Sequence, residues 1–250
     1  MSHSCDYKTI FDKRAKDYIN ALVNFPEVRK DEFKNFIKLL QLKKNENFLD
    51  VPCGTGICST FLKDSIQYTG LDPCAVFINF CKNKGLNTLQ ADMQHQIFAQ
   101  DNFDVIGSLA GVHHISDRKS LYAEWYRILK PGGRLIILDV AKNSSTSNFL
   151  NHFVDQYNST GHQGLFLDEN DNALLDLIGF KKIEHKNIDC TWAAFNKESM
   201  CNFFRALFAL DKLENNLLLH KELNKNFKTI ETSLSYQLIW PLKYIRAIKN

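Results

Sequence analysis

The sequence predicts an α/β fold, in which a parallel sheet carries helices on both faces. Three observations support this fold. Strand-like apolar segments alternate with helix-like segments over the middle of the chain. Three of the expected strands end in an acid, at Asp50, Asp72 and Asp92. A turn with two glycines, Gly54 and Gly56, joins the first strand to the next helix, and glycine tolerates the positive φ that such turns need.

The expected elements follow in a regular order. Residues 8–22 read as an amphipathic helix, and a second helix is expected from Pro26 to Lys43 because apolar residues recur there at helical spacing. The first strand ends at Asp50, and the next strands are expected at residues 67–72, 87–93, 103–110 and 129–139. Helices are expected between them at residues 57–64, 74–84 and 117–129.

The second half of the chain changes character. Residues 142–164 are rich in Asn, Ser, Thr, Gly and Gln and are expected to form a mobile polar connection over the strand ends. A helix over 168–179 and a strand over 181–188 follow. Two further helices are then expected, from Asn196 to Leu210 and from Leu213 to Thr232, before a last strand over 242–248.

Composition limits the class of protein. The net charge of the 250 residues is +3 and the lysines are scattered, so we expect no nucleic-acid partner. No apolar run approaches the ~20 residues that span a bilayer, and the first residues lack the apolar core of a secretion signal. The seven cysteines contain no C-x-x-C pair, which predicts reduced thiols in a cytoplasmic protein rather than disulfides or a zinc site.

The glycine turn, Cys53-Gly-Thr-Gly56, is the most informative motif. Free N–H groups at the start of a helix, next to bare glycine backbone, suit a nucleotide-like cofactor at the end of a strand. A dinucleotide motif would need a third glycine where Ser59 stands. With Asp50 four residues before Gly54, the segment instead resembles the first motif of class I S-adenosylmethionine-dependent methyltransferases, with Pro52-Cys53 where a glycine is commoner.

Further residues carry this resemblance over about residues 45–190. Leu129-Lys-Pro-Gly-Gly133 resembles the family's signature before the fifth strand. The resemblance implies that Asp72 accepts the ribose hydroxyls and that Asp92 meets the adenine amino group while its neighbour Met93 packs on the ring. The remaining cofactor residues expected from it are Arg14, Tyr18, Asp50, Pro52, Cys53, Gly54, Gly56, Pro73, Leu109 and Ala110. Each aspartate alone would equally well cap the helix after its strand.

The same resemblance implies a seven-stranded, mostly parallel sheet with an antiparallel last strand. Residues 1–250 then form one domain. Its parts are N-terminal helices that partly cover the cofactor (1–43), a cofactor-binding core (44–190), a helical cap insertion before the last strand (191–241) and the final strand (242–250). A homodimer through the apolar stripe of the insertion is the alternative to a cap, and ordinary core packing explains the stripe as well.

The expected function is methyl transfer from S-adenosylmethionine to a small molecule by in-line displacement, with the acceptor atom (O, N or C) left open. His114 and His113 follow the fourth strand, and either ring can serve as a base near neutral pH. His152, Asp155, Tyr157 and His162 in the polar connection are further candidates to reach the acceptor, although a solvated loop explains them too. The acid that metal-dependent catechol enzymes place after that strand is absent, which predicts no metal.

Two other functions fit parts of the sequence. A non-catalytic S-adenosylmethionine-binding protein would need the same cofactor motifs and no base. Tyr126 and Lys130 match the Y-x-x-x-K pair of NAD-dependent short-chain oxidoreductases, but Lys130 runs straight into Pro131, behind the fifth strand.

Overall fold

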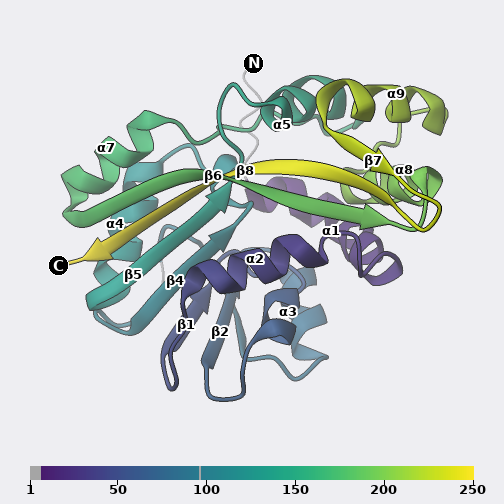
Figure 1. Ribbon diagram of the computed structural model, residues 1–250. Helices are drawn as coiled ribbons and strands as arrows, with labels where there is room; N and C mark the ends of the chain where they lie inside the picture. The colour runs from purple at the N-terminus through teal and green to yellow at the C-terminus, as the bar shows by residue number, and fades with distance from the viewer. Residues whose placement is uncertain (1–6, 96) are drawn as a thin grey trace.

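The sheet of the computed structural model, which describes residues 7–95 and 97–250, has the strand order β3-β2-β1-β4-β5-β8-β6 (Figure 1). The strands from β3 to β5 are parallel, and β8 runs antiparallel to β5, β6 and β7. The strands are β1 Asn47–Asp50, β2 Gln67–Asp72, β3 Thr88–Gln90, β4 Phe103–Leu109, β5 Leu129–Asp139, β6 Phe180–Ala194, β7 Thr229–Glu231 and β8 Tyr236–Lys249. The expected α/β fold with an antiparallel last strand is therefore confirmed, and the short β7 adds an eighth strand beside β8.

Helices pack on both faces of this sheet. The α-helices are α1 Tyr7–Asn24, α2 Lys30–Leu40, α3 Ala75–Lys82, α4 Arg118–Ile128, α5 Ser145–Asn148, α6 Asp155–Tyr157, α7 Glu169–Ile178, α8 Lys197–Leu207 and α9 Asn216–Asn226. Short 3-10 helices cover Ile57–Phe61 (η1) and Val112–His114 (η2), and a π-helix covers Phe149–Val154 (η3). Neighbouring strand residues point to opposite faces, so Phe48 packs in the same core as Phe36 of α2, whereas Leu49 packs with Trp125 of α4.

The helix expected over residues 57–64 is wrong, because only the five-residue η1 forms there. The hydroxyls of Ser59 and Thr60 donate to the carbonyls of Gly56 and Ile57, which satisfies the backbone in a tight turn. The chain then leaves the helical region at Leu62. The second helix also starts later than Pro26, at Lys30, and ends at Leu40 because Gln41 takes the left-handed conformation.

The polar connection expected over residues 142–164 is largely helical instead. Ser144 caps α5, and η3 and α6 continue it to Tyr157. Four apolar residues of η3, Phe149 and Phe153 among them, are buried. They attach a segment of otherwise polar composition to the core. The polar composition of the segment did not predict these helices, because its apolar residues are few, although they lie on one side of the helix.

The strands around the insertion are longer than expected, and its second helix is shorter. β6 continues to Ala194, pairing with β8 from Tyr236, so both strands extend well into the range assigned to a helical insertion. The helix expected to reach Thr232 ends at Asn226, and β7 follows it. The register places Thr191 opposite Ile239, and the buried residues alternate along this part of β6. That alternation is the strand period which the sequence-based assignment overlooked.

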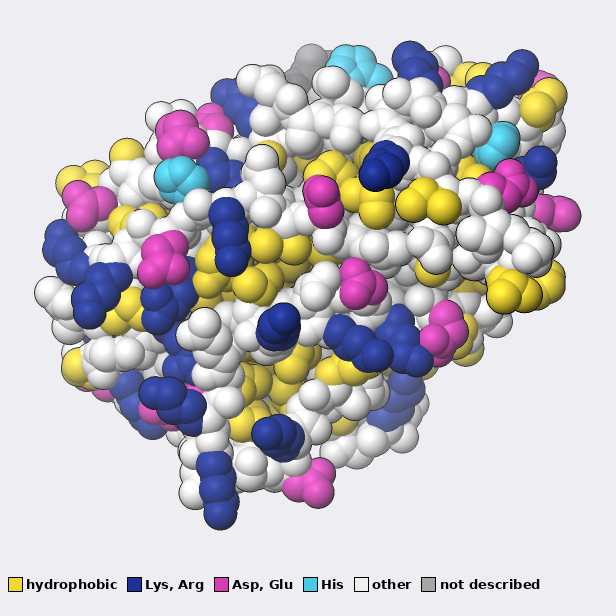
Figure 2. Space-filling view, in the orientation of Figure 1, with side chains coloured by type: hydrophobic (Ala, Val, Ile, Leu, Met, Phe, Trp, Pro, Cys, Tyr) yellow, Lys and Arg dark blue, Asp and Glu magenta, His cyan; other side chains and the backbone are white. Residues whose placement is uncertain are grey.

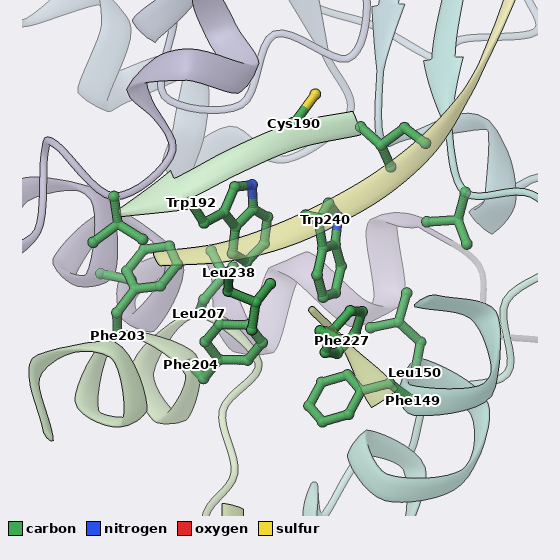
Figure 3. Close-up of a cluster of buried hydrophobic side chains, with 14 of the residues drawn as sticks. Phe149, Leu150, Cys190, Trp192, Phe203, Phe204, Leu207, Phe227, Leu238 and Trp240 are labelled. Carbon is green, nitrogen blue, oxygen red and sulfur yellow. The ribbon is translucent and has the colours of Figure 1, made fainter. Parts of the chain in front are cut away.

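The extended strands and α8 form one aromatic core (Figure 3). The indoles of Trp192 on β6 and Trp240 on β8 stack with ring centroids 4.3 Å apart. Phe203 and Phe204 of α8 pack against Trp192 and are fully buried. The apolar stripe of α8 therefore faces this chain's own core and offers no surface to a second copy. Figure 1 shows α8, α9 and β7 grouped beside the far ends of β6 and β8.

The face of the molecule seen in Figure 2 carries lysine and arginine side chains interspersed with acidic ones, without a continuous basic stripe. Within residues 7–95 and 97–250, no helix combines the length and the hydrophobicity needed to cross a bilayer.

Candidate active site

A cavity lies beyond the carboxyl ends of β1 and β4. Helix α1 and the aromatic core around α8 line other parts of it. The cavity brings together ten residues expected from the sequence: Arg14, Tyr18, Asp50, Pro52, Cys53, Gly54, Leu109, Ala110, His113 and His114. In an open α/β sheet, this is the side on which ligands bind.

The glycine turn (residues 53–56) forms one wall of the cavity. Gly54 and Gly56 have φ values of 52° and 68°, a conformation that residues with a Cβ rarely adopt. The N–H of Gly54 donates to Asp72 at 2.9 Å. Gly56 lies behind the wall, where a Cβ would come within 2.5 Å of Leu86. The turn is thus held by its own main chain and by close packing against the strand ends.

Two buried carboxyls support this turn. Burial raises the pKa of both Asp50 and Asp72 to about 7, although each accepts hydrogen bonds that lower it. Asp50 lines the cavity and accepts from the Tyr68 hydroxyl at 3.1 Å and from the Cys58 thiol. Asp72 accepts three, from the N–H groups of Gly54 and Cys74 and from the hydroxyl of Tyr7. Asp50 therefore has acceptor capacity to spare for a donor in the cavity.

Tyr7 of α1 occupies the position next to Asp72. Its hydroxyl donates to the Asp72 carboxylate at 2.9 Å, and its ring lies 5.8 Å from that of His114. Tyr7 also lines a second depression, which contains Pro73, Asp92 and Met93. These three predicted residues are thus separated from the main cavity by α1. A ligand that reaches from the glycine turn to Asp92 has to displace the tyrosine.

Two other residues of α1 line the main cavity. The Arg14 guanidinium is buried and donates to the Leu207 carbonyl of α8 at 3.0 Å. The Tyr18 hydroxyl accepts from Arg29 at 2.8 Å, and Arg29 forms a buried ion pair with Glu32. Both side chains are fixed by partners in the cavity wall, Leu207 and Arg29, so they present a preformed polar surface to a ligand.

The two histidines after β4 are buried and have different surroundings. His113 Nδ1 lies 2.6 Å from Asp139, the last residue of β5, and its backbone N–H also donates to that carboxylate. Although burial raises it, the charge and hydrogen bonds of His113 lower the pKa of Asp139 below its usual value. Burial, together with the nearby rings and Arg14, holds the pKa of His114 well below 6.5. His114 is therefore uncharged at neutral pH.

His162 joins them from the segment after α6. Its ring lies 5.7 Å from that of His113 and 5.6 Å from that of His114, and it also lines the cavity. Burial lowers its pKa well below 6.5, and His113 and Arg14 add to this. Of the four residues suggested in the polar connection, only His162 lines this cavity; His152 is exposed and lines another depression.

Sequence reasoning missed Asp139 as a member of the site. Asp139 ends a strand, as Asp50 and Asp72 do, so the same rule of acids at strand ends would have drawn attention to it. The contact between Tyr7 and Asp72 was not predicted either, because it spans 65 residues. Tyr126 and Lys130 lie elsewhere: Tyr126 packs on Phe180 and Lys130 pairs with Asp104. The oxidoreductase motif therefore has no place in this cavity.

Comparisons with known proteins agree with this geometry. Residues 49–137 match the family described as a methyltransferase domain. Phosphoethanolamine N-methyltransferase 3 of Arabidopsis thaliana is 29% identical over 121 residues, which cover 45% of this chain and 25% of that protein. A ubiquinone/menaquinone biosynthesis C-methyltransferase of Geotalea daltonii is 30% identical over 136 residues, covering 49% and 57%. The chain thus spans about a quarter of the length of the first of these relatives.

The fold extends the likeness to nearly the whole chain. Phosphoethanolamine N-methyltransferase 2 of Haemonchus contortus, solved in complex with S-adenosyl-L-methionine, superposes with a TM-score of 0.65 at 18% identity, covering 98% of this chain and 60% of that one. Residues 49–137 thus match a methyltransferase domain, and the fold of nearly the whole chain is that of this solved methyltransferase.

Proposed function

We propose that this protein transfers a methyl group from S-adenosylmethionine to a small molecule that binds in the cavity beside His113, His114 and His162. The observation that carries the proposal is that one cavity contains both the glycine turn with Asp50 and this cluster of buried rings. The relatives named above methylate small molecules according to their names, which supports the same class of acceptor here.

The residues around the glycine turn fit the cofactor. Asp50 has spare acceptor capacity facing the cavity, which suits the amino group of the methionine portion. Asp72 would take the ribose hydroxyls once Tyr7 has moved, and Asp92 with Met93 would take the adenine in the neighbouring depression. Arg14 is the cation available to the methionine carboxylate. When bound, S-adenosylmethionine supplies a methyl group on a sulfonium, which is a good leaving group.

The rest of the cavity fits an acceptor of limited size. Its walls include Leu207, Phe208, Trp192 and Trp240, so the aromatic core and α8 narrow the space next to the histidines. Buried walls exclude water and hold the acceptor in line with the methyl group, which can supply about 7–11 kcal/mol of the barrier. His113 is arranged as a base would be, because Asp139 fixes its Nδ1 and leaves Nε2 for a proton.

A thermal melt tests cofactor choice. The Tm would be measured with S-adenosylmethionine, S-adenosylhomocysteine and NAD at the same concentration; a ligand present at a hundred times its dissociation constant adds about 2.7 kcal/mol of stability. We expect the first two to raise the Tm and NAD to leave it unchanged. Stabilisation by NAD alone would reject the proposal.

Turnover separates an enzyme from a non-catalytic binding protein. Candidate acceptors with amine, hydroxyl or thiol groups would be incubated with S-adenosylmethionine labelled in its methyl group, and transfer of the label would be counted. We expect labelled product with at least one class of small acceptor. Full cofactor binding without transfer to any of them would favour the non-catalytic alternative. A cytoplasmic location and the absence of a nucleic-acid partner remain predictions from the sequence.

A further inference from the structure

Three histidines meet at the cavity in a way that methyl transfer by itself does not require. One ring nitrogen of each of His113, His114 and His162 lies within 4.8 Å of the other two. All three side chains are buried. The main chain ties the two segments together, because the Leu165 N–H donates to the His113 carbonyl at 2.7 Å. We call these three residues the histidine cluster.

Outer partners orient two of the three rings. His113 Nδ1 lies 2.6 Å from the Asp139 carboxylate, which orients the ring and leaves Nε2 for a ligand. His162 Nδ1 lies 3.0 Å from the side-chain oxygen of Asn151, which also accepts from the Gly164 N–H. An amide oxygen only accepts, so His162 Nδ1 donates and its Nε2 also keeps a lone pair. A carboxylate or amide behind each imidazole is the arrangement that fixes metal-binding histidines.

The third ring has an unexplained polar atom. His114 Nδ1 is buried and finds no hydrogen-bond partner among the described residues. Leaving a buried polar atom unpaired is costly, so such atoms are rare in folded proteins and call for an explanation. A ligand bound at the cluster would supply the missing partner.

We propose that the histidine cluster binds a divalent first-row transition metal of the Zn²⁺ type, with an open coordination position that faces the cavity. Three protein ligands and one open position are the pattern of catalytic zinc sites. Imidazole suits Zn²⁺, Co²⁺, Ni²⁺ and Cu²⁺, whereas Mg²⁺ and Ca²⁺ prefer oxygen ligands, and no carboxylate belongs to the cluster itself.

Distances and charges are compatible with such an ion. Zn–N bonds of about 2.0–2.1 Å in a tetrahedral site put ligand nitrogens about 3.4 Å apart, so the rings have to draw together slightly. The charge of Arg14 acts on His114 and His162 and opposes a metal. Asp139 opposes that effect through the negative charge it places behind His113. The cluster is therefore expected to bind a transition metal more weakly than a site without the arginine.

A metal bound here would make the histidines its ligands instead of the general base that the sequence predicts. An acceptor that binds the open position through a lone pair of oxygen, nitrogen or sulfur has its own pKa lowered by the ion and needs no protein base. The lack of an acid after β4, which predicted no metal, concerns a different kind of site. This consequence for the acceptor rests on the proposed function, whereas metal binding itself does not.

The experiment uses the full chain without an affinity tag, because a histidine tag would bind the probe. Co²⁺ would be titrated into metal-free protein while visible absorption reports tetrahedral coordination, and Zn²⁺ would then be added to displace it. We expect one Co²⁺ per chain, displaced by Zn²⁺ and untouched by excess Mg²⁺. No stoichiometric uptake, or displacement by Mg²⁺, would overturn the proposal without any variant.

Variants then locate the site. His162→Gln should weaken Co²⁺ binding by more than about 100-fold, and Asn151→Ala, which removes the partner of that ring together with two bonds to Gly164, by roughly 10- to 100-fold. His152→Gln is the matched control, because His152 is the exposed neighbour of Asn151 and should bind Co²⁺ like the wild type. Equal binding by His162→Gln and wild type would place the metal elsewhere and reject the proposal. Thermal stabilisation of His162→Gln by S-adenosylmethionine is read separately, so a failed metal site leaves the cofactor proposal standing.

Discussion

The glycine turn and the histidine cluster line the same cavity but are built in different ways. The turn and its two aspartates come from two strands that are neighbours in the sheet and nearly consecutive in the chain. Main-chain hydrogen bonds and positive φ angles hold it. The cluster combines the loop after β4, the segment after α6 and outer partners on β5 and η3. Local sequence therefore specifies the turn, whereas packing between distant segments specifies the cluster.

This difference predicts that a substitution in one part of the cavity leaves the function of the other part unchanged. The cofactor should depend on strand-end carboxylates, and turnover on the cluster and its outer partners. Four experiments test this separation, beginning with the largest expected effect.

Asp72→Ala should weaken S-adenosylmethionine binding most, on the order of 100-fold, because charge-assisted hydrogen bonds to a buried carboxylate are lost. Isothermal titration calorimetry measures this change. The control is Asp64→Asn, which alters an exposed acid away from the cavity and should bind the cofactor normally. Unchanged affinity of the Asp72 variant would show that the ribose contact is misplaced.

Asp139→Asn should lower turnover roughly 10- to 100-fold while the cofactor affinity stays within twofold of the wild type. The substitution keeps the shape but removes the charge that fixes His113. Initial rates at saturating cofactor, together with calorimetry, separate the two effects. Asp189→Asn, an exposed acid on β6, serves as the control. Equal losses of rate and affinity would mean that the two parts of the cavity are not independent.

Tyr7→Phe should raise the affinity for S-adenosylmethionine by about three- to tenfold. The hydroxyl of Tyr7 holds Asp72 in the structure, and its removal lowers the free energy needed to open that position. The ring and its contacts with Phe11 remain. Calorimetry against the wild type measures the change, and weaker binding would show that the hydroxyl contacts the cofactor instead.

Asp50→Asn tests the smallest effect, which depends on pH. The pKa of Asp50 is raised to about 7, whereas an unfolded aspartate has a pKa of about 3.9. The carboxyl of the folded wild type is therefore mostly protonated at pH 5 and charged at pH 8, so its contribution to stability falls between about pH 4 and pH 7 and then levels off. Asparagine stays neutral throughout.

We therefore expect the Tm of Asp50→Asn to match the wild type near pH 4 and to exceed it near pH 8. Using the difference between the two proteins removes the opposite contribution of His114 and His162, whose lowered pKa values favour the folded state as pH rises toward 6.5. A Tm difference that does not change with pH would show that Asp50 keeps its charge at pH 5.

The sequence by itself determined the alternating α/β fold, the aspartates at strand ends and the turn at Gly54 and Gly56. These features depend on local periodicity and on backbone conformations that only a few residue types adopt, so they can be read from neighbouring residues. In the structure, Asp117 and Asn196 cap the helices expected to start near them and accept from the backbone N–H groups of Ser120 and Ser199.

The tertiary structure alone decided where distant side chains meet. Tyr7 reaches Asp72 across 65 residues, and Asp139 reaches His113 across 26, so no local pattern records either contact. The cluster also needs His162. Its polar neighbours in the sequence predicted a solvated loop, whereas the apolar residues of η3 are buried in the structure. Burying a polar group is costly unless its hydrogen-bond partner is buried beside it. Contacts of this kind therefore form only where the whole fold brings both partners together.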